Sequence, residues 1–91
     1  MILHEKQYLN FIMRNGIGKH DRVASSPLSY LSYLRSVSSI IQEDITPALL
    51  KNEVDATNIA EKIKGKRATS TIRNYCSAMH QYVKMVEVRR F

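Results

Sequence analysis

The sequence predicts an all-α domain, a compact bundle of four to five helices around one core. Apolar residues recur at steps of three and four in several segments, and no segment shows the strict alternation of a half-buried strand. Capping residues, prolines and glycines bound these segments. The chain of 91 residues suits a single domain, residues 1–91, which would bury about 60 to 65% of the surface that the unfolded chain exposes.

The first half of the chain predicts two helices. Residues 3–15 have a broad apolar side, and Gly16 is placed to end that helix. A loop over 16–25 follows. Ser26 can then cap a second helix with Pro27 in its first position, running to about Ile41. The side of this helix opposite its apolar face is short and rich in hydroxyl groups, and it carries Arg35.

Two short helices with a tight bend between them are predicted next. Thr46-Pro47 is a cap followed by a proline, and Ile45 and Leu50 flank it as a hydrophobic staple. Asp55 is a second candidate cap, flanked by Val54 and Ile59, for a helix that stops at Gly65.

The last segment has the clearest helical periodicity. Thr69 or Ser70 can cap a helix that runs to about Val86. Its predicted core stripe consists of Ile72, Tyr75, Cys76, Met79, Tyr82, Val83 and Val86. The opposite side carries Arg73, Asn74, Ser77, His80, Gln81 and Lys84, and four of these, Arg73, Ser77, His80 and Lys84, form a nearly straight row.

The net charge of +6 is concentrated in one part of the chain. Residues 62–86 contain no acid, whereas the remaining eight basic and eight acidic residues balance. The basic residues of this segment are Lys62, Lys64, Lys66, Arg67, Arg73 and Lys84. Such a run is often only a solvated helix surface, but soluble surfaces normally mix both signs. A one-signed segment therefore favours a face that meets a polyanion.

The sequence offers few groups for catalysis. The three histidines are scattered without metal-ligand spacing, and Cys76, the only cysteine, lies within a predicted core stripe. We therefore expect no enzymatic activity, cofactor or metal. No apolar run is long enough to cross a membrane and the start does not read as a secretion signal, so we expect a cytoplasmic protein.

Three stretches resemble the core-binding domain of tyrosine recombinases, the phage-integrase type. "ATSTIRNYCSAMHQYVKMV" is similar to the last helix of that domain, "DITPALL" to its short helix before the final pair, and "SPLSYLSYLRSV" to its second long helix. The residues that carry the likeness in the last helix are Thr71, Ile72, Tyr75, Ser77, Ala78 and Tyr82. Similar helical modules also precede nuclease domains in bacterial restriction-type proteins, and the same residues suit that reading.

The resemblance implies a helical bundle of the SAM-like, integrase core-binding type. It also implies a non-catalytic module that grips duplex DNA with its second and last long helices. The catalytic constellation of the recombinases is not in this sequence, so no tyrosine here inherits the nucleophile role. The DNA-binding residues implied are Arg35, Lys64, Lys66, Arg67, Arg73, Asn74, Ser77, His80 and Lys84.

The partner expected from charge and resemblance together is duplex DNA, with further domains in a longer parent protein. A second hypothesis is a helical interaction or oligomerisation module whose basic face docks an acidic protein. The sequence leaves open the DNA site, the oligomeric state and the choice between a recombinase and a nuclease.

Overall fold

The computed structural model describes residues 2–15 and 27–89. In these ranges the chain forms four helices and no named strand: α1 (Glu5–Asn15), α2 (Pro27–Ile41), α3 (Glu53–Ile63) and α4 (Thr69–Arg89). The all-α bundle predicted from periodicity is therefore confirmed. The loop over 16–25 and the cap at Ser26 lie outside the described residues.

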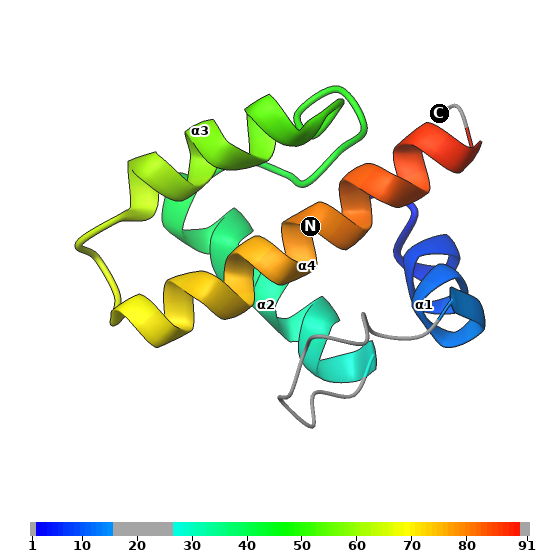
Figure 1. Cartoon of the computed structure of the whole chain (residues 1–91), viewed down its shortest axis with the longest axis horizontal. Coiled ribbons are helices and arrows are strands. Elements are labelled where there is room, and N and C mark those ends of the chain that lie inside the picture. Colours follow the sequence, from blue (N-terminus) through cyan, green and yellow to red (C-terminus); the bar gives the residue numbers. More distant parts are fainter. Residues whose placement is uncertain (1, 16–26, 90–91) are drawn as a thin grey trace.

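Helix α4 is the central element of the bundle. It runs across the molecule with α2 behind it, α3 antiparallel along one side, and α1 beside its C-terminal end (Figure 1). The other three helices all contact α4. One face of α4 is left uncovered by this arrangement, and that face can meet a partner.

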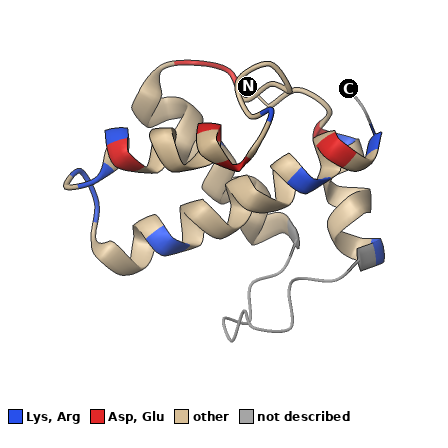
Figure 2. Cartoon of the chain, turned by 45° about the horizontal axis from the view of Figure 1, so that its top comes forward, with Lys and Arg blue, Asp and Glu red and all other residues tan. Residues whose placement is uncertain are grey.

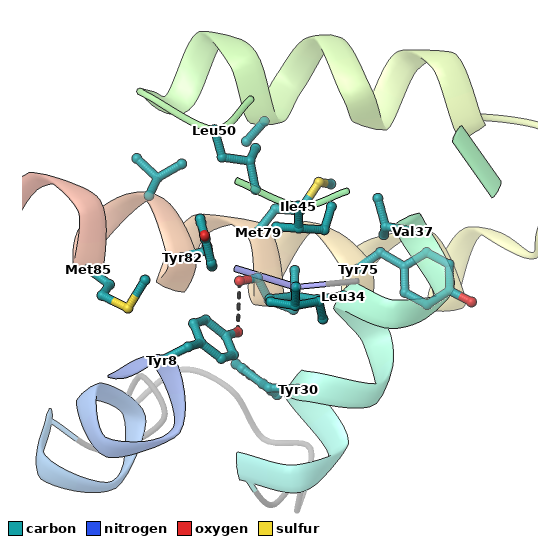
Figure 3. Packing of buried hydrophobic residues seen from close by; sticks show 14 of the residues in the cluster. Tyr8, Tyr30, Leu34, Val37, Ile45, Leu50, Tyr75, Met79, Tyr82 and Met85 are labelled. Carbon is teal, nitrogen blue, oxygen red and sulfur yellow. Dashed lines mark hydrogen bonds between the residues drawn. The ribbon is translucent and has the colours of Figure 1, made fainter. Parts of the chain in front are cut away.

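The core lies where the helices converge on α4 (Figure 3). The predicted stripe is confirmed, because Tyr75, Met79, Tyr82, Val83 and Val86 are buried and Ile72 and Cys76 are half-buried. The prediction was wrong for Gln81, which is only 8% exposed. Because α4 packs against three other helices, its buried side is wider than a stripe at three- and four-residue steps.

Hydrogen bonds tie the beginning of the described chain to α4. The Tyr8 hydroxyl donates to the Ala78 carbonyl at 2.9 Å, and the Tyr82 hydroxyl donates to the Leu3 carbonyl at 2.8 Å. The Leu3 amide in turn donates to the Ile45 carbonyl at 2.8 Å. Residues 2–4 therefore pair with a distant segment, and α1 begins at Glu5 rather than at residue 3.

The short helix predicted at Thr46-Pro47 is a single turn. The Leu49 and Leu50 amides donate to the Thr46 carbonyl, and the Leu49 amide also lies 3.1 Å from Thr46 Oγ1. Ile45 and Leu50 are fully buried on either side of this turn. The turn does not continue because Ile45 is held by the N-terminal segment and the next helix already begins at Glu53.

Helix α3 begins two residues before the predicted Asp55 cap. Asn52 is the N-cap, and its side chain accepts from the Asp55 amide at 3.0 Å. Asp55 Oδ2 accepts from the Lys51 amide at 3.0 Å, so the two side chains cap the first turn together, close to the reciprocal pattern of a capping box. Val54 is 67% exposed and forms no staple. As predicted, the helix stops at Gly65, whose φ of +87° favours glycine.

The Asn52 cap gives a direct stability prediction. Asn52→Ala removes the acceptor for the Asp55 amide and should lower the free energy of unfolding by about 1 kcal/mol. Asn58→Ala, on the exposed surface of the same helix, is the matched control and should change it little. Equal urea midpoints for both variants would show that Asn52 does not cap α3.

Two buried tyrosines make stability sensitive to high pH. Burial raises the pKa of Tyr82 to about 12. The pKa of Tyr8 is raised further above its usual range, mainly by burial and also by the negative charge of ionised Tyr30. In the unfolded chain a tyrosine ionises near pH 10, so the unfolded state loses protons first as pH rises. The free energy of unfolding should therefore be unaffected by these groups below about pH 10 and should fall between about pH 10 and 12. Urea unfolding at pH 8 and pH 11 tests this, and equal midpoints would contradict it.

Candidate nucleic-acid interface

The uncovered face of α4 carries a row of polar and basic side chains, Arg73, Ser77, His80 and Lys84, which we call the α4 row. Arg73 and Lys84 are exposed, whereas Ser77 and His80 are half-buried. Arg73 and Lys84 are eleven residues apart, about three helical turns, so they point the same way at a separation of about 16 Å. Asn74 lies beside the row and is half-buried.

The loop that leads into α4 adds three cations at the N-terminal end of this row. Lys64, Lys66 and Arg67 are all exposed in this α3–α4 loop, residues 64–68, which Figure 2 shows as a basic turn. The Lys66 amide donates to the Ile63 carbonyl at 3.0 Å, and Arg67 Nη1 donates to the Lys66 carbonyl at 2.8 Å. These bonds shape the loop, in which Lys64 and Arg67 lie beside Ile72 of α4 and Lys66 lies toward the end of α2. The loop leads directly into the α4 row, and we call loop and row together the strip.

The cations of this strip are not neutralised within the described part of the chain. Among the described residues, Arg35 pairs with Glu5, and His80 lies beside Glu53. The strip cations outside both pairs are Lys64, Lys66, Arg67, Arg73 and Lys84. Their charge is therefore available to a partner.

Glu53 of α3 lies beside the middle of the α4 row, although residues 62–86 themselves contain no acidic residue. His80 Nδ1 lies 3.7 Å from Glu53 Oε1. Because α3 runs antiparallel to α4, its first turn lies opposite the middle of α4, and Figure 2 shows acidic segments on α3. His80 therefore has a carboxylate partner of its own, unlike Arg73 and Lys84.

Arg35 does not join the strip as an unpaired cation. Arg35 Nη2 lies 2.8 Å from Glu5 Oε1, and the side chain lines a depression together with Glu43 and Asp44. Ser38, on the same helix, is buried and donates to the Glu43 carbonyl at 2.6 Å. Arg35 and Ser38 of α2 are thus engaged with an acid and with backbone of the chain itself.

Sequence reasoning missed two arginines at the other end of the strip. Arg14 of α1 and Arg89 of α4 line one depression with Lys84. Both lie outside the acid-free segment, in stretches where acids and bases balance in number. Only the packing of α1 beside the end of α4 brings them together (Figure 1).

The described residues hold no group of three His, Cys, Asp or Glu side chains placed to bind a metal ion. Burial raises the pKa of the Cys76 thiol, which makes the thiolate scarcer at neutral pH. None of the described helices combines the length and apolar character that crossing a membrane requires. The chemistry that this surface presents is that of cations and hydrogen-bond donors.

No protein-family model, curated protein or solved structure matches the chain. The resemblance to the core-binding domain of tyrosine recombinases stays a prediction from the sequence. The strip of cations is independent of it, because it follows from the positions of the helices.

Proposed function

We propose that the chain is a duplex-DNA-binding module and that the α4 row and the α3–α4 loop form its contact surface. The observation that carries the proposal is the set of five cations on one exposed strip that form no ion pair with the described part of the chain. Neutralising backbone phosphates with such side chains releases counterions, which drives binding regardless of base sequence.

The dimensions of the strip suit a duplex. Helix α4 has 21 residues and is about 30 Å long. The separation of about 16 Å between Arg73 and Lys84 exceeds the width of the major groove, about 12 Å, so the two cations can reach phosphates on both sides of one groove. Ser77 lies between them, and its small side chain lets the helix approach the backbone closely.

The proposed role is that of a clamp that holds DNA for a separate catalytic domain. A core-binding-type domain of an integrase, or the N-terminal module of a restriction-type nuclease, would use such a surface in this way. Arg73 and Asn74 are the candidates for contacts with base edges, whereas the loop cations would contact phosphates only.

The salt dependence of DNA binding tests the proposal. Five phosphate contacts predict that log affinity falls with log salt, with a slope of magnitude about 4.5. Affinity should therefore fall about 500-fold between 50 and 200 mM salt. Filter binding or fluorescence anisotropy with a random-sequence duplex measures this. A flat salt response, or no binding at 50 mM salt, would contradict the proposal.

An acidic protein partner is the alternative that the same strip allows. Replacing the duplex with an acidic polypeptide such as poly-glutamate gives a direct comparison at equal charge concentration. Binding of the polypeptide with no preference for the duplex would contradict a surface shaped for DNA.

A further inference from the structure

A cleft lies at the C-terminal end of α4, at the far end from the basic loop. It has a volume of about 610 Å³ and is lined by Phe11, Arg14, Lys84, Glu87, Val88 and Arg89. The lining includes buried Phe11, whereas the charged side chains are exposed. The described lining residues include three cations and one carboxylate, a net charge of +2.

The two arginines reach this cleft for a local physical reason. Arg14 lies in the last turn of α1 and Arg89 in the last turn of α4, where a cation interacts favourably with the negative end of the helix dipole. Because the two helix ends pack side by side, both guanidinium groups share one surface. Neither forms an ion pair with the described part of the chain, and Glu87 in the same cleft pairs with neither.

Lys84 belongs both to the cleft and to the α4 row, so the two surfaces are continuous. Arg89 follows Lys84 by five residues, about 8 Å farther along the helix and about 140° around its axis, so the two side chains reach the cleft from different sides of α4. A duplex laid along the row meets the cleft at Lys84, which the two surfaces share. Arginine is suited to that place, because its planar fork can donate two hydrogen bonds to one phosphate.

We propose that Arg14 and Arg89 form a second phosphate-binding site, which holds the backbone of the same duplex at the end of α4 away from the loop. This inference rests on the proposed function and extends it to residues that the sequence did not single out. With the cleft engaged, seven cations contact phosphates, and the slope of log affinity against log salt rises from about 4.5 to about 6.3.

The test compares Arg14→Gln/Arg89→Gln with the wild type on a 16-base-pair duplex. The double variant should lower the slope by about 1.8 and, if the electrostatic contribution vanishes at 1 M salt, weaken binding about 60-fold at 0.1 M. Lys6→Gln/Lys51→Gln is the matched control, because it removes two exposed charges from outside the strip and the cleft. Arg14→Lys/Arg89→Lys keeps both charges and should retain most of the binding.

Glu87→Gln should change DNA affinity in the opposite direction to Arg14→Gln/Arg89→Gln. It removes the only carboxylate among the described residues that line the cleft, and it should tighten DNA binding about threefold, for a charge about 7 Å from a phosphate in water. If the wild type binds DNA and Arg14→Gln/Arg89→Gln binds it as well as Lys6→Gln/Lys51→Gln does, the second phosphate-binding site is overturned. The proposed function would then still stand. A wild type that binds no DNA would overturn both.

Discussion

Reversing two charges in the α3–α4 loop, Lys66→Glu with Arg67→Glu, should weaken duplex DNA binding by about 60-fold or more at 0.1 M salt. Both side chains are exposed and form no ion pair with the described part of the chain, so each is free to neutralise a phosphate. Losing two contacts lowers the salt slope by about 1.8, and the new carboxylates add repulsion. The loss should be the same for all duplex sequences, because phosphate contacts carry no base information.

The control for this variant must change the net charge equally. Lys6→Glu with Lys51→Glu does so at exposed positions outside the strip and the cleft. Anisotropy titrations of both double variants against the same duplex separate a local contact from a general charge effect. Equal losses in the two variants would place the contact elsewhere or show that only net charge matters.

Tyr8→Ala should lower the free energy of unfolding by about 3 to 5 kcal/mol. The Tyr8 side chain is fully buried, its ring centroid lies 5.7 Å from that of Tyr82, and its hydroxyl bonds to Ala78 in α4 (Figure 3). Truncation leaves a cavity where α1 meets α4 and removes an aromatic contact. A domain of this size has about 5 to 14 kcal/mol of stability in total, so much of it would be lost.

Tyr8→Phe separates the ring from the hydroxyl. It keeps the packing and removes only the hydrogen bond to the Ala78 carbonyl, so it should cost about 1 kcal/mol. Urea denaturation followed by circular dichroism measures both variants. A Tyr8→Ala variant as stable as Tyr8→Phe would contradict the assignment of this ring to the core.

The elements predicted correctly are those specified by local pattern. The periodicity of α4 and the start of α2 at Pro27 need no knowledge of the rest of the chain. The errors arose where two local signals competed. Asp55 and Asn52 can both begin a helix, and Thr46 can begin either a helix or a turn. Contacts with distant residues select between such alternatives, for example the pairing of Ile45 with the N-terminal segment.

The candidate site also has parts that local spacing predicts and parts that depend on how the helices pack. The α4 row was predictable because helical spacing alone aligns Arg73 with Lys84. The pairing of Arg35 with Glu5, the approach of Glu53 to His80 and the meeting of Arg14 with Arg89 depend on how separate helices pack. No periodicity within one segment carries that information.

The central position of α4 affects how the chain folds as it is made. The other three helices are synthesised before α4 and pack on it, and the Tyr82 hydroxyl reaches back across 79 residues to the Leu3 carbonyl. At about 5 to 20 residues per second, the 21 residues of α4 take about 1 to 4 s to synthesise. During that time Leu34 and Ile63 have no α4 to cover them, and the nascent chain presents apolar surface that chaperones bind.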